Sequence, residues 1–139
     1  MADLKLVIFR LGSLICAAPA TSVREVISIS PPTRIPGASA SVAGLMNVRG
    51  TLLTVVDGRR LLGAPAGPAD SVLVLHQGER LVGLIVDEVL DLAEVAEESL
   101  SPGAALPGVD PSLVQAVGRQ GDRVFALLDP VALMAPVLG

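Results

Sequence analysis

Residues 43–57 read AGLMNVRGTLLTVVD, and this stretch decides the fold. It is apolar and carries one charge, Arg49, before its last residue. Gly44 and Gly50 bracket a short run, and residues 52–56 form a β-branched and aliphatic run of strand length. The pattern predicts a strand, a tight turn and a second strand, with Arg49 at the turn.

The one cation inside this stretch needs a polar partner. A buried and unpaired charge costs several kcal/mol, so Arg49 requires either water or a carboxylate. The best candidate partner is Glu25, and we expect the two residues to form an ion pair that orders the hairpin. If the pair is partly buried, Arg49→Ala should cost about 3 kcal/mol or more, because Glu25 loses its partner.

Composition predicts a β-rich chain with an aliphatic core. The 139 residues fit one domain, or two small lobes that share a core. Hydrophobic residues make up 51% of the chain, but Phe9 and Phe125 are its only aromatic residues. The core must therefore consist of valine, leucine, isoleucine and alanine, a composition that suits strands.

Charge and hydropathy exclude several classes of function. The net charge is −4, the pI is near 4.8, and almost no aromatic residues are present to stack on bases, so nucleic acid is not an expected partner. Charged residues interrupt every apolar run before it reaches the roughly 18 residues of a membrane span. With no signal-peptide pattern and with Cys16 as the only cysteine, we expect a cytoplasmic protein without disulfides or membrane insertion.

Turn residues divide the rest of the chain into short strands. Glycine turns predict three further strand pairs, at residues 4–18, 71–86 and 113–128. Residues 21–26 fit either one helical turn or the start of a strand through Ile29, and we favour a short turn that runs into a strand.

Two aspartates mark the starts of predicted helices. Asp57 precedes a helical turn at residues 59–62, and Asp129 followed by proline predicts a helix through Met134. Proline and glycine define the predicted loops and linker, at residues 31–41, 63–69 and 101–111.

The two halves of the chain repeat weakly. Residues 7–26 run strand, glycine turn, strand and then Glu-Val, and residues 72–89 have the same order. A second pair of segments, 55–62 and 127–134, also repeats an aliphatic pair, an aspartate and a later aliphatic pair. Two related β lobes explain these matches, although capped hairpins also coincide by chance.

Residues with reactive side chains are too few for an enzyme site. His76 stands at a predicted hairpin end, where we expect a solvated ring, and Cys16 lies in a predicted apolar strand, where we expect an inert thiol. One histidine and one cysteine cannot form a transition-metal cluster. The acidic residues between 87 and 98 lack the spacing of a calcium loop, and we expect a solvated acidic face there. No glycine-rich phosphate loop occurs. We therefore expect no catalysis, metal or cofactor.

Asp57 offers one alternative function. Residues 53–57, LTVVD, look like the strand that ends in the phospho-accepting aspartate of a response-regulator receiver. Such a site also needs acidic magnesium ligands after the first strand and a lysine late in the chain. Here Arg10 follows the first apolar run and Lys5 is the only lysine, so a helix cap at Asp57 fits better.

Six short motifs stand in a fixed order between about Leu4 and Met134. They are VREV at 23–26, a proline-bounded loop through Ile35-Pro36, Gly44 with NVRG at 47–50, VVD at 55–57, VGLIVD at 82–87, and GDR at 121–123 with Leu127-Leu128. Their order and spacing together resemble the CheW-like coupling proteins of bacterial chemotaxis.

The resemblance implies an all-β fold with short helices. A single CheW-like domain, residues 1–139, would consist of two SH3-like five-stranded β-barrels packed on one another. Lobe 1 would cover about residues 12–66 and lobe 2 about residues 67–130, with room for exchange of the N-terminal strand and the C-terminal helix.

The resemblance also implies a non-catalytic adaptor. It would bridge the cytoplasmic tip of a chemoreceptor, a helical hairpin, and the CheW-like regulatory domain of the histidine kinase CheA. The residues carried over to the receptor-binding groove are Val23, Glu25, Arg49, Gly50, Leu52 and Leu92. Those carried over to the kinase-facing end are Leu14, Ile27 and Ile29.

Physical arguments fit such an adaptor. The chain has more apolar side chains than two small barrels can readily bury, and open strand edges can pair with a like-folded neighbour. The same lobe ends would allow self-association. Two residues depart from the family pattern, Thr54 in place of proline and Gly58 in place of leucine, so the end of that strand and its helical turn should differ. The same surfaces would also suit an adaptor in a motility or second-messenger pathway.

Overall fold

The computed structural model describes residues 3–65, 67–102 and 109–138. Strands dominate this part of the chain and the helices are short, as the composition predicts. The elements are β1 (Asp3–Leu11), β2 (Leu14–Pro19), η1 (Ala20–Ser22), β3 (Val23–Ser28), β4 (Val42–Val48), β5 (Thr51–Asp57), α1 (Gly58–Leu61), β6 (Ser71–Gln77), β7 (Arg80–Val86), β8 (Glu88–Ala96), η2 (Glu97–Ser99), β9 (Ser101–Pro102), η3 (Pro111–Leu113), β10 (Val114–Gln120), β11 (Arg123–Leu128) and α2 (Pro130–Leu138).

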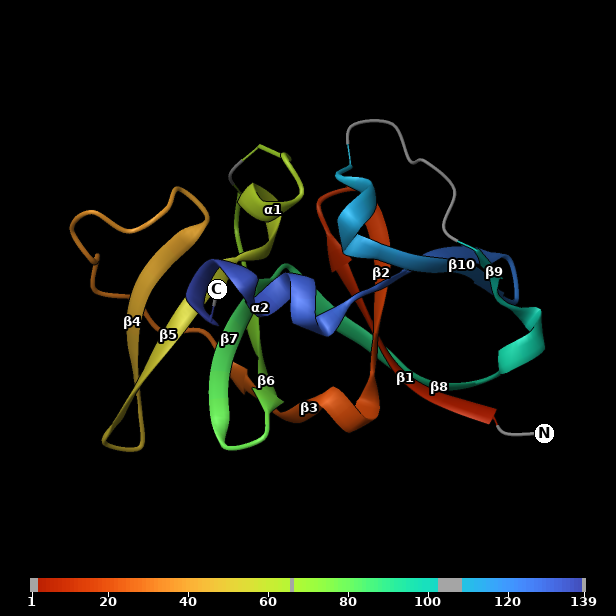
Figure 1. Ribbon diagram of the computed structural model, residues 1–139, viewed down its shortest axis with the longest axis horizontal. Helices are drawn as coiled ribbons and strands as arrows, with labels where there is room; N and C mark the ends of the chain where they lie inside the picture. The colour runs from red at the N-terminus through yellow and green to blue at the C-terminus, as the bar shows by residue number, and fades with distance from the viewer. Residues whose placement is uncertain (1–2, 66, 103–108, 139) are drawn as a thin grey trace.

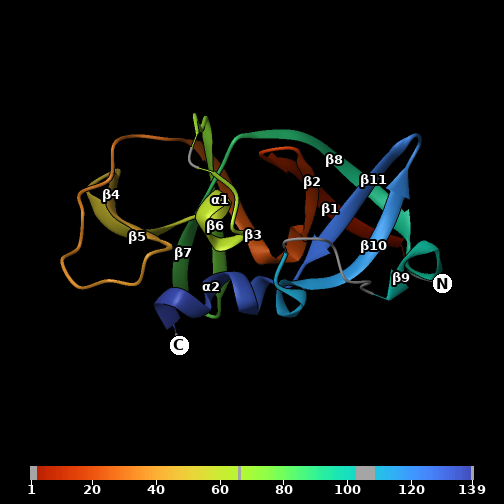
Figure 2. The same cartoon turned by 90° about the horizontal axis from the view of Figure 1, so that it is seen from above.

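The strands form two sheets that lie side by side (Figure 1; Figure 2). One sheet has six strands in the order β8-β1-β2-β11-β10-β9, and the other has five in the order β3-β6-β7-β5-β4. The sixth strand, β9, is only two residues long. The expected fold of two packed β lobes, each with five main strands, is therefore confirmed.

The predicted sequence repeat corresponds to equivalent positions in the two sheets. The hairpin β1–β2 in one sheet matches the hairpin β6–β7 in the other, and β2 pairs in parallel with β11 as β7 pairs in parallel with β5. At the outer edges, β8 pairs with β1, and β3 pairs with β6. The strand that follows each hairpin thus leaves its own sheet and joins the other one.

Because of this reciprocal exchange, the two sheets do not contain the same strands as the expected lobes, residues 12–66 and 67–130. That division separates β2 from β11 and separates β6 and β7 from β5, although these strands are hydrogen-bonded neighbours. The expected division leaves room for exchange of the N-terminal strand and the C-terminal helix, and the parallel pairings β2–β11 and β5–β7 link the two halves further. The helix α2 also crosses over, because it follows β11 but packs on β5, β6 and β7.

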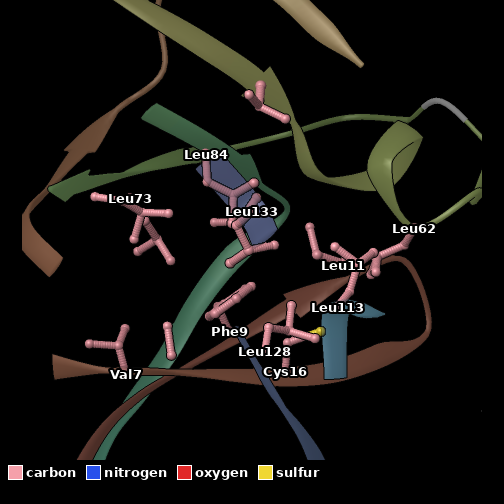
Figure 3. Packing of buried hydrophobic residues seen from close by; sticks show 14 of the residues in the cluster. Val7, Phe9, Leu11, Cys16, Leu62, Leu73, Leu84, Leu113, Leu128 and Leu133 are labelled. Atoms are coloured by element: carbon pink, nitrogen blue, oxygen red, sulfur yellow. The ribbon is translucent and has the colours of Figure 1, made fainter. Parts of the chain in front are cut away.

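Three apolar clusters account for most of the aliphatic residues. One lies between the sheets and unites Phe9 of the six-stranded sheet with Leu73 and Leu84 of the five-stranded sheet (Figure 3). The other two lie within single sheets, one around Phe125 and one around Met46. Since β1 is buried on both faces, its sequence is a continuous apolar run rather than an alternating one.

The apolar cluster between the sheets buries many of the hydrophobic side chains that the sequence analysis expected at interfaces. Within the described residues, the large hydrophobic side chains that remain exposed are Val26, Leu52, Leu92, Val124 and Val131. Strongly exposed large hydrophobic side chains are therefore few among the described residues.

Asp57 and Asp129 cap the two α-helices, as predicted. Each carboxylate accepts hydrogen bonds from backbone N–H groups of the first helical turn. The second helix continues beyond Met134 to Leu138, because its inner face stays against the shared cluster.

Gly58, one of the two departures from the family pattern, has a packing reason. A Cβ atom at this buried position would lie 2.6 Å from the carbonyl oxygen of Ile85 and 2.7 Å from Cδ2 of Leu11. A leucine here would force both neighbours to move. The other departure, Thr54, lies within β5 and pairs with Leu45, so the strand continues through it.

The acidic stretch forms strand β8, in which one face is buried and the other is exposed to solvent. In β8, Ala93 and Val95 are buried while Asp91 and Glu94 are exposed, the alternation of a strand with one covered face. The predicted loop at 101–111 lies largely outside the described residues, as does residue 66 of the predicted linker.

Candidate protein-interaction site

The predicted turn between β4 and β5 consists of Arg49 and Gly50. Both have positive φ, 50° and 85°, the combination of a two-residue type I′ hairpin turn. The side-chain oxygen of Asn47 accepts a hydrogen bond of 2.9 Å from the backbone N–H of Gly50. Sequence and structure therefore agree on the position and the tightness of this turn.

Arg49 is an unusual residue for its backbone conformation. It is the only non-glycine residue with positive φ in the described part of the chain. This conformation costs an L-residue roughly 1–2 kcal/mol, and asparagine, aspartate or glycine is preferred there. The turn itself therefore does not call for arginine, and the reason for its presence must lie in the side chain.

The Arg49 side chain reaches Glu25, as predicted. Its Nη2 donates to both carboxylate oxygens at 2.9 Å. The Arg49 side chain is 71% exposed and that of Glu25 is 34% exposed. An ion pair with this much solvent contact contributes less than about 1 kcal/mol to folding. The predicted pair is thus confirmed, whereas the condition of partial burial that would give it a cost near 3 kcal/mol is not met for Arg49.

This ion pair closes the five-stranded sheet. Glu25 lies on β3 at one edge of the sheet, and Arg49 belongs to the hairpin that forms the opposite edge. The six-stranded sheet has the equivalent contact, because Gln120 at the β10–β11 turn donates a hydrogen bond of 3.1 Å to Asp91 on β8. Both sheets are therefore curled far enough for the distal hairpin to reach the first edge strand.

Leu52 and Leu92 are the most exposed large hydrophobic residues among those described. Leu52, two residues beyond Gly50 on β5, is 63% exposed, and Leu92 on β8 is 66% exposed. They belong to different sheets, so a partner that covers both must contact both lobes. Single exposed leucines are common. These two are of interest because Leu52 follows the Arg49–Gly50 turn closely and Leu92 lies on the other sheet.

The other predicted site residues are half-buried and belong to different clusters. Val23 and Leu14 pack against the shared cluster, whereas Ile27 and Ile29 pack against the cluster of the five-stranded sheet. The structure therefore brings Glu25, Arg49 and Gly50 together, and it brings Ile27 and Ile29 together, but it places Leu14 in a separate cluster.

Ile29 also lines a hollow of about 1000 Å³. The hollow lies beneath the loop that joins β3 to β4, with Ile85 in its wall and the ion pair of Arg60 with Asp57, 3.6 Å long, beside it. An apolar floor with a polar edge is the arrangement of many protein contacts.

A cluster around Asp87 was not expected from the sequence. Asp87 was assigned to a solvated acidic face, but it is only 5% exposed. Arg10 Nη1 donates to its Oδ2 at 2.9 Å, and Arg59 donates through Nε to Oδ1 at 2.9 Å and through Nη2 to Oδ2. The backbone N–H of Gly12 donates to Oδ1 at 3.2 Å.

A signal for this cluster was present in the sequence. Asp87 directly follows the buried run of residues 82–86, and Arg10 interrupts the first apolar run. Charges held next to buried strands must be paired. The exposed acidic residues that follow Asp87 hid this signal, because they make the whole stretch look solvated.

The charges of this cluster shift the pKa of both main partners. Burial alone raises the pKa of Asp87, but hydrogen bonds from Arg59 and Gly12, together with the charges of Arg59 and Arg10, outweigh it and hold that pKa below its usual value. The hydrogen bond to Asp87 raises the pKa of Arg59. Both groups are therefore charged at neutral pH.

Cys16, His76 and Asp57, the residues considered above for chemistry, are each held by burial or by hydrogen bonds within the fold. Cys16 is fully buried, and burial, with a smaller effect of the Asp87 charge, raises the pKa of its thiol to about 12. A ring nitrogen of His76 hydrogen-bonds the carbonyl oxygen of Thr21 at 2.9 Å. Asp57 caps α1, and the sheets are not the single parallel sheet of a receiver, so the receiver alternative is wrong.

Neither a metal site nor a membrane-spanning helix is found among the described residues. Within residues 3–65, 67–102 and 109–138, no three histidine, cysteine, aspartate or glutamate side chains gather where they could hold a metal ion. No described helix has the length and apolar character needed to cross a membrane.

Comparisons with known proteins agree with this geometry. A family profile described as a CheW-like domain matches residues 5–137. A solved structure, the scaffolding protein TtCheW from Thermoanaerobacter tengcongensis, superposes with a TM-score of 0.83 at 22% identity and covers 92% of this chain and 90% of its own.

Two curated relatives are similar over shorter stretches. A probable chemotaxis protein CheW of Rhizobium etli is 37% identical over 103 residues, which cover 72% of this chain and 66% of the relative. Protein PilI of Pseudomonas aeruginosa is 35% identical over 96 residues, which cover 67% of this chain and 54% of that protein. The matched stretches thus span about two thirds or less of the length of these relatives.

Proposed function

The chain belongs to the CheW-like domain family, and on that premise we propose that it is a non-catalytic adaptor of bacterial chemotaxis. It would couple the cytoplasmic tip of a chemoreceptor to the regulatory domain of the histidine kinase CheA, in the cytoplasm. The observation that carries the proposal is the family match over residues 5–137 together with Arg49, a residue that the turn disfavours, paired to Glu25 beside an exposed leucine.

The receptor-facing surface would consist of Val23, Glu25, Arg49, Gly50, Leu52 and Leu92. A receptor tip made of two helices can present an apolar stripe, and exposed leucines on both sheets would receive it. The Arg49–Glu25 pair would lie at the polar edge of the contact and fix the orientation of the helix.

The kinase-facing surface would include Leu14, Ile27 and Ile29. The hollow beneath the β3–β4 loop supports this assignment for Ile29, because a partner side chain can enter it. A regulatory domain of similar fold could pack its own sheet end against this one. A second copy of the chain could bind the same lobe end in place of the kinase domain. Self-association is therefore the alternative result of a binding measurement on this surface.

A direct binding measurement tests the receptor assignment. The purified chain is titrated with a soluble receptor fragment that contains the helical tip, and separately with the CheA regulatory domain. Leu52→Ser and Leu92→Ser should each weaken receptor binding by about tenfold or more, the effect of losing a contact worth about 1.4 kcal/mol. Val124→Ser is the matched control, because Val124 is also exposed but lies on β11, outside the assigned surface.

Unchanged receptor binding in both leucine variants, or an equal loss in the Val124 control, would contradict the receptor assignment. Receptor binding that is lost while CheA binding is kept would support two separate surfaces.

A second candidate is the same adaptor in another signalling pathway. The observation that favours it is the similarity to Protein PilI, a relative that is not named for chemotaxis. A deletion strain assayed in parallel for chemotactic swimming and for surface motility separates the two. Loss of surface motility with normal swimming would replace the chemotaxis assignment.

A further inference from the structure

Asp87 is the only charged residue that is buried in the described part of the chain. It lies between β7 and β8, where the chain passes from the five-stranded sheet to the six-stranded sheet. A buried carboxylate is costly unless its charge and its lone pairs are satisfied. Asp87 is satisfied by two guanidinium groups and a backbone N–H, so its place in the fold is specified by several directional contacts.

The two arginines that donate to Asp87 are connected to different sheets. Arg10 lies near the end of β1, in the six-stranded sheet. Arg59 lies on α1, which directly follows β5 of the five-stranded sheet. The backbone adds to the same junction, because the N–H of Asp87 donates to the carbonyl of Arg10 at 3.0 Å, and the N–H of Asp70, just before β6, donates to the carbonyl of Asp87 at 3.0 Å.

The sheets approach closely beside this cluster. At Gly58 the side chain of Leu11, from the six-stranded sheet, occupies the space that a Cβ atom would need. Gly58 precedes Arg59, and Leu11 follows Arg10. The ionic contact and the tight apolar contact therefore fix the same junction from adjacent residues.

We propose that Asp87 is a positioning residue that clamps the two sheets at one relative orientation through Arg10 and Arg59. The apolar cluster between the sheets holds them together, but apolar contact has no preferred direction. Bidentate contacts between guanidinium and carboxylate groups do have one. The clamp therefore sets the angle between the sheets, while the shared cluster supplies the adhesion.

A consequence for recognition rests on the proposed function. The two exposed leucines assigned to the receptor lie on different sheets, so the orientation of the sheets sets how they are presented to one partner. Loss of the clamp should weaken receptor binding without any change in a residue that contacts the receptor.

Spin-label distances test the clamp directly on the full chain. Labels on Glu79→Cys and Asp122→Cys, two exposed turn positions on different sheets, report the orientation between the sheets. Labels on Ser28→Cys and Glu79→Cys report on the five-stranded sheet alone. Ser28 faces Ser71 in the register, and Glu79 lies in the turn after Gln77, so six strand steps of about 3.3 Å place the two positions about 20 Å apart along the strand. Cys16 is buried and stays unlabelled.

The variant Asp87→Asn keeps the shape of the side chain but loses its charge. We expect the distance distribution between the sheets to broaden or shift, and the distribution within the five-stranded sheet to stay unchanged. Arg10→Gln, at a half-exposed position, removes one arm of the clamp and serves if Asp87→Asn does not fold. Glu94→Gln is the control, because the Lys5–Glu94 pair joins two strands of a single sheet.

A distribution between the sheets that is unchanged in folded Asp87→Asn, or in folded Arg10→Gln, would overturn the clamp. An equal change within the five-stranded sheet would also overturn it, since that pattern means general loosening. These measurements involve no receptor. Failure of the leucine variants to affect binding would therefore count against the receptor assignment within the proposed function, and the distances would still decide the clamp.

Discussion

The guanidinium group of Arg49 contacts both carboxylate oxygens of Glu25 and so joins the two edges of one sheet. Such a contact could serve stability, recognition or both. Because the ion pair is largely exposed to solvent, it contributes little to the free energy of folding. The positive φ of Arg49 is also an unfavourable backbone conformation for this residue. The two effects nearly offset one another in the folded chain, and we therefore propose recognition as the main role of the arginine.

The variant Arg49→Asn separates recognition from stability. Asparagine accepts the turn conformation, which recovers part of a roughly 1–2 kcal/mol cost and offsets the lost ion pair. We expect the free energy of unfolding to stay within about 1 kcal/mol of the wild-type value, while receptor affinity falls. Urea titrations followed by far-UV circular dichroism measure the first quantity, since the chain has no tryptophan or tyrosine for fluorescence. A large loss of stability with normal binding would reverse the two roles.

Gly44 should be intolerant of any side chain. Its φ is 143°, and a Cβ atom there would lie 2.1 Å from the carbonyl oxygen of Thr33, which accepts a hydrogen bond from the N–H of Leu45. Gly78→Ala is the matched control, because Gly78 also has positive φ but open space around it. We expect Gly44→Ala to lose about 1–3 kcal/mol more stability than Gly78→Ala, the range seen for overpacking. Equal losses would mean that the loop before β4 shifts freely.

The contribution of Asp87 to stability should depend on pH. Its pKa is lowered in the folded chain, so the charged form is favoured by folding and the contribution is complete above the unfolded pKa, near 4. At pH 7, Asp87→Asn should be less stable than the wild type by about 3 kcal/mol, because two arginines lose their counter-charge.

Below about pH 4 the wild type should lose this advantage as Asp87 takes up a proton, so the two unfolding free energies should converge. Urea titrations at pH 7, 5, 4 and 3 follow the difference. A difference that stays constant through this range would show that the charge of Asp87 is not the source.

Cys16 should be unreactive in the folded chain. Its thiol is buried and its pKa is raised to about 12, so the reactive thiolate is scarce at pH 8. A chromogenic disulfide reagent should react slowly in buffer and rapidly in urea. The rate in buffer should follow the opening of the fold, and the destabilised Gly44→Ala variant should react faster than the wild type. Fast labelling of the native wild type would contradict the burial of this residue.

Local signals in the sequence were enough to place most elements. Glycine turns and aspartate caps located the hairpins and both helix starts, because these features depend on a few neighbouring residues. The pairing of Arg49 with Glu25 followed from the cost of an unpaired cation together with the family pattern. The extent of α2 and the strand nature of β8 were missed, since both depend on the apolar clusters that cover one face.

Long-range organisation was harder to infer. The repeat was recognised, but the exchange of β3 and β8 between sheets depends on which edge each strand reaches, and no short motif encodes that. The burial of Asp87 was missed for the same reason, because its partners come from residues 10 and 59, far away in the sequence. The family resemblance pointed to Leu52 and Leu92, but only the structure shows that their side chains are exposed.

The exchange of edge strands also constrains the chain during its synthesis. The strand β1 cannot pair with β8 until residues 88–96 have left the ribosome, and β2 cannot pair with β11 until residues 126 and 127 have done so. At about 5–20 residues per second, the apolar first hairpin waits roughly 5–20 s for its partners. Until residues 88–127 are synthesised, the edges of this hairpin stay open, and an open apolar strand edge is prone to pair with another chain.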